Sequence, residues 1–334
     1  MKPSPLWRRC ASLAGRGLAL LLVLLLTGWA IAALYFDLLS GTSLRTFGAS
    51  SYGIAMAGTL LAFRGRGKGI AICLAGFALV LAWWLTLKPS NDRVWQPDVA
   101  QPAWAEIDGD RVTIHNVRNC DYRTEGDYTP HWETRSYDLS QIRGMDIFLT
   151  YWGSPWIAHP IVSFQFGDND YIAMSIETRK EVGEQYSAVR GFFRYYELIY
   201  TVSDERDVVR LRTNFRKGEE TYLFHTRATP EHARATFLNY VNKINRIRNH
   251  PEWYNALTNN CTTNIATLAG EPKWDWRVLL NGHADQMLYE RGDLATGNLP
   301  FAQLKQQAHI NAVARAADDA ADFSRRIREG RVGF

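Results

Sequence analysis

Two uncharged apolar runs near the beginning of this 334-residue chain constrain its fold most. Leu18 to Phe36 and Gly69 to Leu87 each contain 19 residues without a charged side chain. A transmembrane helix needs about 20 predominantly apolar residues, so both runs are long enough to cross a bilayer. The chain is therefore expected to divide into a membrane domain, residues 1–90, and an extracytoplasmic domain, residues 91–334.

A third, weaker span is predicted over Thr46 to Phe63, which is uncharged but rich in small residues. Its Ala49, Gly53 and Ala57 follow each other at intervals of four, a spacing that lets two helices approach closely. We therefore predict three transmembrane helices.

The basic residues around these runs predict the orientation. Only Arg45 lies between the run that ends at Phe36 and the weaker span that begins at Thr46. Seven cations lie on the other side, before Leu18 or between Phe63 and Gly69: Lys2, Arg8, Arg9, Arg16, Arg64, Arg66 and Lys68. By the positive-inside rule the N-terminus is cytoplasmic and everything after Leu87 faces outward. The alternative, a cleaved signal peptide over the first run, requires an apolar core of 7–15 residues, and this run is longer.

The outer domain combines strand and helix patterns. Alternating strands are expected over Arg111–Val117, Asp146–Tyr151, Ile157–Phe166, Tyr171–Thr178, Tyr195–Val202 and Glu220–Thr226. An amphipathic helix follows, with Thr229 as N-cap and Pro230 at its first position, and another is expected over Ala308–Glu329. The fold class is thus α+β, with a mostly antiparallel sheet and packed helices.

The stretch Asn259–Asn264 (NNCTTN) and an upstream histidine suggest thiol chemistry. Asn259 or Asn260 is a good N-cap, which places Cys261 in the first turn of a short helix that runs to about Ala269 and is closed by Gly270. There the unpaired amides and the helix dipole favour a thiolate. His159 lies in a strand pattern and is the candidate proton acceptor.

Three further residues are candidates for the same site. Glu177 would orient His159, but symmetric pairing of the hairpin about Asp168 and Asn169 sets His159 opposite Thr178 and turns Glu177 to the other face. A shift of one residue would reverse this, and a surface salt bridge is the alternative role for Glu177. Asn260 and Ser163, which shares a strand face with His159, are candidate substrate or oxyanion ligands.

Other roles for these residues stay open. Cys261 could form a disulfide with Cys120, since only these two of the four cysteines are expected outside the membrane. His159 could be a buried structural imidazole. The remaining histidines show no metal-ligand spacing, so no metal or cofactor is expected. The net charge of +4 includes the membrane loops, and no basic stripe points to nucleic acid.

The stretch from about Trp95 to Asn264 resembles the periplasmic domain of the Lnb type of bacterial lipoprotein N-acyltransferase. The resemblance rests on the segments Ala158–Phe164, Ser175–Glu181, Glu197–Tyr200, Asp204–Asp207, Trp253–Asn255 and Asn259–Thr262. It implies a circularly permuted papain-like fold in a multi-pass protein of the bacterial inner membrane. It also implies transfer of an acyl chain from a lipid ester to the N-terminal amine of a lipoprotein, so bacterial lipoproteins or phospholipids are the expected partners. A cell-wall cysteine peptidase or amidase, and a non-catalytic domain, remain the alternatives.

Overall fold

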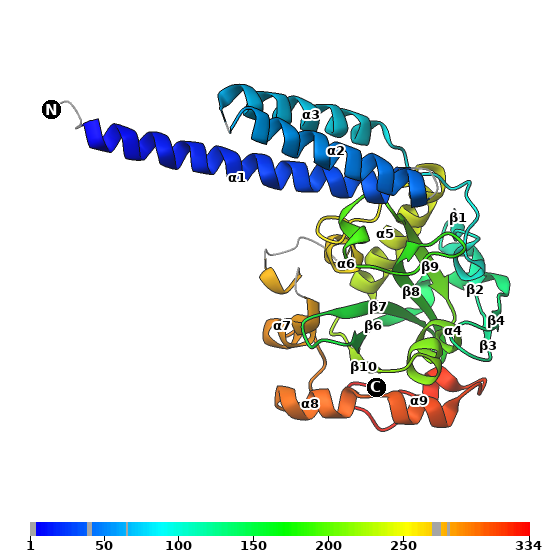
Figure 1. The fold of residues 1–334 in the computed structure, drawn as a ribbon. Coiled ribbons are helices and arrows are strands. Elements are labelled where there is room, and N and C mark those ends of the chain that lie inside the picture. Colours follow the sequence, from blue (N-terminus) through cyan, green and yellow to red (C-terminus); the bar gives the residue numbers. More distant parts are fainter. Residues whose placement is uncertain (1–4, 39–41, 65, 269–274, 279–280) are drawn as a thin grey trace. The chain divides into compact units, whose positions relative to one another are not determined.

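The structure, a computed structural model, describes residues 5–38, 42–64, 66–268, 275–278 and 281–334 (Figure 1). The chain separates into two compact units. We call Met1–Pro89 together with Ser187–Tyr195 the helical unit, and Ser90–Tyr186 together with Tyr196–Phe334 the sheet unit.

The helical unit contains α1 (Pro5–Asp37), α2 (Thr42–Ala62), α3 (Gly67–Thr86) and a short turn, η3 (Arg190–Phe192). Each of the three long helices packs against the other two. Among the described residues, two segments are long and apolar enough to cross a membrane, Leu13–Asp37 and Gly67–Thr86. The structure therefore has two candidate spans and not the three predicted, because the Gly, Ser and Thr residues of α2 lower its hydropathy.

The small residues of α2 do form part of a helix contact. Ala49 is buried, and a Cβ added at Gly53 would lie 3.1 Å from Cδ1 of Ile31 in α1. Ala57, the third member of the predicted stripe, is exposed. The close approach predicted from the spacing is thus confirmed for the first two positions only.

The sheet unit is built on eight strands in the order β1-β2-β9-β8-β7-β6-β10, with β5 paired to β2. All pairs are antiparallel except β2 with β9. The strands are β1 (Trp104–Asp108), β2 (Arg111–Arg118), β5 (Trp132–Asp138), β6 (Ile142–Trp152), β7 (Ala158–Phe166), β8 (Asp170–Arg179), β9 (Glu197–Ser203) and β10 (Glu219–His225). A separate hairpin joins β3 (Asp121–Tyr122) to β4 (Tyr128–Thr129).

Helices cover both faces of the sheet. On one face Phe164 of β7 packs on Phe237 of α5, with ring centroids 5.2 Å apart. On the other face Ile161 of β7 lies in a buried cluster with Val208 and Phe323. The helices are α4 (Glu205–Arg210), continued by the π-turn η4 (Leu211–Phe215), α5 (Pro230–Asn249), α6 (Cys261–Leu268), α7 (Ala284–Arg291), α8 (Phe301–Ala308), α9 (Asn311–Ala317) and α10 (Phe323–Arg326).

The fold confirms the α+β class and corrects the tail. The predicted strands correspond to β2, β6, β7, β8, β9 and β10, whereas β1 and β5 were missed. The tail is not one helix over Ala308–Glu329. Ile310 donates its N–H to the carbonyl of Thr221 in β10, and the chain turns at Asp318, whose φ is 44°. These two points divide the segment into separate short helices.

Candidate active site

Cys261 is the first residue of α6, and its neighbours fix the start of that helix. The side-chain oxygen of Asn260 accepts a hydrogen bond from the N–H of Thr263 at 3.0 Å. The Thr263 hydroxyl in turn accepts from the N–H of Asn260 at 3.1 Å. This reciprocal capping satisfies donors that a helix start otherwise leaves unpaired. The predicted N-cap is thus confirmed at Asn260; the predicted closure of the helix at Ala269 and Gly270 lies outside the described residues.

Capping also occupies the Asn260 side chain, which was predicted as a substrate or oxyanion ligand. Its Nδ2 donates to the carbonyl of Ala256 at 2.7 Å, while its Oδ1 serves as the cap. Both ends of the amide are therefore used within the protein. Asn260 positions Cys261, and one of the two hydrogens on its Nδ2 is donated to Ala256.

His159 and Glu177 lie opposite each other because the β7–β8 hairpin is shifted by one residue from symmetric pairing. Ile161 pairs with Ser175, and the pairs run on to Phe166 with Asp170 around a Gly167–Asn169 turn. Continuing this register two residues beyond Ile161 places His159 across from Glu177 and not from Thr178. Directly opposed residues of antiparallel strands point to the same face, so Glu177 lies on the His159 side.

The His159 ring links Cys261 to Glu177. Its Nε2 lies 2.7 Å from the hydroxyl of Ser175 and 3.0 Å from Oε1 of Glu177. Ser175 donates its own proton to Glu177 at 2.7 Å, so Nε2 is the donor toward both oxygens. The Cys261 thiol lies close enough to the ring to contribute to the raised pKa of His159.

A buried arginine, Arg212, forms an ion pair with Glu177. Nη2 of Arg212, in η4, lies 3.0 Å from Oε1 of Glu177, and Nη1 lies 3.3 Å from Glu219. Arg212 is 5% exposed, and the Glu177 side chain is 25% exposed. Neither Arg212 nor Ser175 was predicted. Ser175 could have been found from its period-two spacing to Glu177, but Arg212 lies in a π-turn without a periodic signal.

The charges of this array shift its pKa values in opposite directions. Burial and the positive charge of Arg212 would each lower the pKa of His159. The Glu177 carboxylate and the hydrogen bonds to Cys261 and Glu177 raise it by more, so that the pKa of His159 is about 9. Burial alone would raise the pKa of Glu177, but His159 and Arg212 hold it well below its ordinary range. At neutral pH the two therefore form an imidazolium–carboxylate pair.

The structure does not bring Ser163, the other predicted ligand, to this site. Its hydroxyl donates to Oε1 of Glu205 at 2.5 Å, and Arg328 binds the same carboxylate at 2.6 Å. Ser163 is fully buried, and four residues of strand separate it from His159, which is roughly 13 Å at 3.3 Å per residue. It belongs to a buried ionic network that stabilises the opposite end of β7.

Asn281 connects the two elements that carry Cys261 and His159. Its Nδ2 donates to the Thr262 hydroxyl at 2.6 Å, and its Oδ1 accepts from the N–H of Ala158 at 2.8 Å. Asn281 thus ties the second residue of α6 to the first residue of β7. The adjoining Gly282 lies so close to Pro155 that an added Cβ would be 2.2 Å from its carbonyl oxygen.

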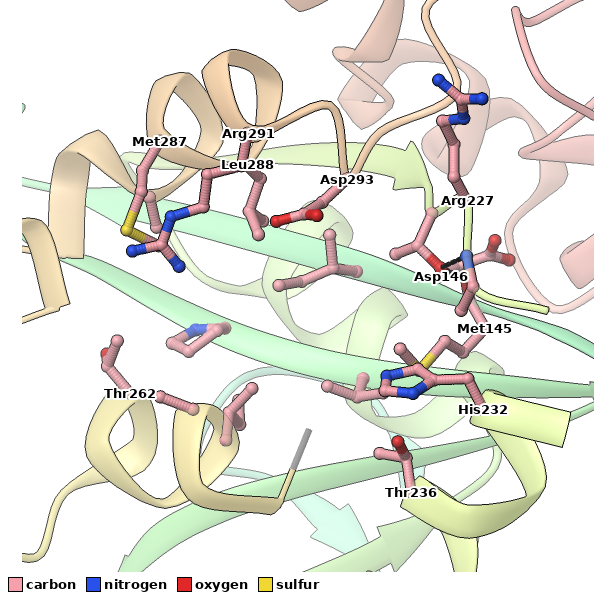
Figure 2. A pocket seen from close by; sticks show the side chains of 18 of the residues that line it. Met145, Asp146, Arg227, His232, Thr236, Thr262, Met287, Leu288, Arg291 and Asp293 are labelled. Atoms are coloured by element: carbon pink, nitrogen blue, oxygen red, sulfur yellow. Dashed lines mark hydrogen bonds between the residues drawn. The ribbon is translucent and has the colours of Figure 1, made fainter. Parts of the chain in front are cut away.

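A cavity of about 810 Å³ lies on the α5 side of the sheet (Figure 2). Thr262 and Pro160, the chain neighbours of Cys261 and His159, line it, whereas Cys261 and His159 themselves do not. Figure 2 shows Thr262 at one end and Met145 and His232 at the other. Between them the lining includes the apolar side chains of Val162 and Ile265. Its volume is in the range of small-molecule sites.

The cysteines carry no disulfide among the described residues: Cys73, Cys120 and Cys261 are free. The alternative bridge between Cys120 and Cys261 is therefore wrong. Cys120 is buried, and burial together with the carboxylate of Asp207 raises its pKa to about 12, the environment of an unreactive thiol. In the part of the chain that the structure describes, no three His, Cys, Asp or Glu residues converge as a metal site.

Comparison with known proteins identifies part of this domain. Residues 128–282 match the family model described as the Lnb N-terminal periplasmic domain. The matched segment includes Cys261, His159 and Glu177. No curated protein and no solved structure matches the chain.

Proposed function

We propose, from the Lnb N-terminal periplasmic domain that residues 128–282 form, that this protein is a membrane-anchored thiol acyltransferase. The observation that carries the proposal is the convergence of three side chains: the His159 imidazole lies 3.0 Å from the Glu177 carboxylate, and the Cys261 thiol is close enough to raise the pKa of that imidazole. A thiol, a base and a group that orients the base are the three parts of covalent acyl transfer. The α6 cysteine follows the β7 histidine in the chain, the order of a circularly permuted papain-like fold.

The chemistry follows from the positions of these atoms. The proton of the Cys261 thiol is held by His159, as the imidazolium that pairs with Glu177, and the thiolate attacks the carbonyl carbon of a lipid ester. The backbone N–H of Cys261, at the start of α6, stabilises the oxyanion. The ester C–O bond breaks, the imidazolium gives its proton to the leaving alcohol, and a thioester remains on Cys261. An incoming amine then attacks the thioester, His159 takes the amine proton, and the free thiol returns after the C–S bond breaks.

The proposed acceptor is the N-terminal amine of a bacterial lipoprotein, and the donor is a lipoprotein diacyl anchor or a phospholipid. Both are held in a bilayer, which fits the two apolar helices of the chain. The matched family model is that of a periplasmic domain, which supports a periplasmic location for residues 128–282. We therefore propose an inner-membrane protein with a cytoplasmic N-terminus.

This orientation needs an odd number of crossings, whereas the two candidate spans alone give an even number. An even number would place the basic N-terminus in the periplasm, against the positive-inside rule. The proposal therefore includes a crossing by α2, supported by its contacts with α1 and α3. A reporter fused before α1 and one fused after Phe334 should report opposite sides; the same side for both would contradict the crossing.

Acyl transfer is tested with the full chain in bilayer nanodiscs, a synthetic diacylated lipopeptide and phospholipid. We expect the N-terminal peptide to gain one acyl mass and Cys261 to carry a thioester that hydroxylamine removes. Cys261→Ser should form no thioester and transfer no acyl group, whereas the matched control Cys120→Ser, which changes a buried cysteine outside the array, should retain both. Cleavage of a muropeptide without acyl gain would favour a peptidase, and neither reaction would favour a non-catalytic domain.

A further inference from the structure

The segment Ser187–Tyr195 connects β8 to β9, two strands of the sheet unit, yet it belongs to the helical unit. It makes both polar and apolar contacts with the C-terminal ends of α1 and α3.

Arg194 closes the end of α3. Its Nη1 donates to the carbonyls of Trp84 at 2.7 Å and Leu87 at 2.8 Å, and its guanidinium stacks 4.0 Å from the Trp84 ring. A cation at this position satisfies carbonyls that the last turn leaves unpaired and opposes the helix dipole. The N–H of Arg194 also donates to Oδ2 of Asp37 at 3.2 Å, and the Trp84 indole donates to the same oxygen at 2.6 Å. One carboxylate at the end of α1 thus joins α3 and the segment.

Apolar packing surrounds this polar junction. Phe193 is buried, and its ring centroid lies 5.2 Å from that of Phe36 and 6.3 Å from that of Trp29. Trp and Arg side chains at the ends of apolar helices are typical of the lipid headgroup level. The segment is therefore held at the level where α1 and α3 end.

Other side chains of the same segment point outward. Val189 is 56% exposed and Phe192 is 43% exposed, and Arg190 lies between them in sequence. The guanidinium of Arg190 rests 4.7 Å from the Tyr195 ring. Exposed apolar side chains beside a cation, at the end of membrane-spanning helices, match a phospholipid surface, where the apolar groups enter the acyl region and the cation meets phosphate.

We propose that Ser187–Tyr195 is an interfacial membrane segment, with Val189 and Phe192 inserted into the phospholipid leaflet and Arg190 at its headgroups. The proposal rests on the part of the proposed function that places α1 and α3 across a membrane, and it does not depend on acyl transfer.

The test is a nitroxide depth measurement on the full chain in nanodiscs of phosphatidylethanolamine and phosphatidylglycerol. The four native cysteines are replaced by serine or alanine, and single labels are placed by Val189→Cys and Phe192→Cys. Two control labels bracket the range: Leu79→Cys, exposed on α3, and Ile107→Cys, an exposed apolar residue at the end of β1. Oxygen concentrates in the acyl region and a charged nickel chelate stays in water, so their collision rates report depth.

We expect labels at 189 and 192 to collide preferentially with oxygen, at a depth of about 5–10 Å below the phosphates. Position 79 should lie deeper, and position 107 should collide preferentially with nickel. If nickel reaches the labels at 189 and 192 as readily as the label at 107, while the label at 79 stays in lipid, the proposal of an interfacial segment is wrong and the membrane anchor stands. If nickel also reaches the label at 79, the interfacial segment and the membrane anchor are both wrong. Two label positions keep the result independent of a folding defect in either variant.

Discussion

Glu177→Gln isolates the electrostatic role of the carboxylate in the array. The substitution keeps the shape and a hydrogen-bond acceptor but removes the negative charge opposite His159. Burial and Arg212 both lower the pKa of His159, and in the variant only the Cys261 hydrogen bond is left to raise it. We expect that pKa to fall from about 9 to below the ordinary 6.5. A fall of more than two units corresponds to at least about 3 kcal/mol of lost preference for the imidazolium, at 1.36 kcal/mol per unit.

The assay is a proton-detected NMR titration of the full chain in micelles with ¹³C-labelled histidine. The chain has eight histidines, and the His159 resonance is the one missing from His159→Asn. Its midpoint should lie near pH 9 in the parent and below 6.5 in Glu177→Gln. The matched control is Glu220→Gln, which removes an exposed carboxylate bonded to a different histidine, His309, and should leave the His159 midpoint unchanged. A His159 midpoint that stays above about 8 in Glu177→Gln would refute the reasoning, because Glu177 is the main group assigned to raise it.

Stability should depend on pH in the direction that this shift sets. The His159 pKa is higher in the folded state than in the unfolded state, so its contribution is fully present below pH 6.5 and is lost as the pH rises through about 9. Glu177 has the opposite sign: its contribution is present above its ordinary pKa of 4.5 and is lost as the pH falls below it. The melting temperature of the parent should therefore decline between pH 7 and 9.5, and that of Glu177→Gln should decline less.

Three substitutions test the supports of the site. Asn260→Ala removes the α6 cap and should cost about 1 kcal/mol, read by thermal denaturation, together with a slower alkylation of Cys261 by iodoacetamide. Gly282→Ala forces a Cβ against backbone and should destabilise the fold by about 1–3 kcal/mol in the same melt; an unchanged melt would contradict the close approach. Arg212→Met leaves Glu177 and its neighbouring carboxylate without their cation and should cost about 3–5 kcal/mol at pH 7, with a smaller loss at pH 4.

The parts of the site that depend on local patterns could be predicted from the sequence. Thr229 caps α5 by accepting from the N–H of His232, and Asn260 caps α6, because capping is decided within a few residues. His159 was predicted in a strand from alternation, and its face follows from the same period. The prediction that His159 and Cys261 lie close together was based on thiol chemistry and on the family resemblance, because residues so far apart in sequence give no local signal of contact.

The parts that depend on long-range pairing could not be predicted. The role of Glu177 depended on a register difference of one residue, which alternation cannot resolve because β8 is buried on both faces and either register buries its apolar side chains. The glycine at Gly167, with φ of +56°, allows the three-residue turn that sets the observed register. Ser163 failed as a ligand for a related reason: a shared face does not measure distance along the strand. Arg212 reaches Glu177 from η4, a turn whose position depends on the packed core.

The charges behind the thiol explain why the site favours an ion pair. Glu177 and Glu219 carry two negative charges, and the arginines bonded to them, Arg212 and Arg216, carry two positive charges. These four side chains sum to zero, and Glu125, which lies 3.1 Å from Arg216, is 58% exposed and screened by solvent. A neutral thiol beside an imidazolium would therefore leave one buried positive charge, and a thiolate beside a neutral imidazole one negative charge. A thiolate with an imidazolium leaves none. Since an uncompensated buried charge costs several kcal/mol, proton transfer from Cys261 to His159 places charge where the surrounding array is already balanced.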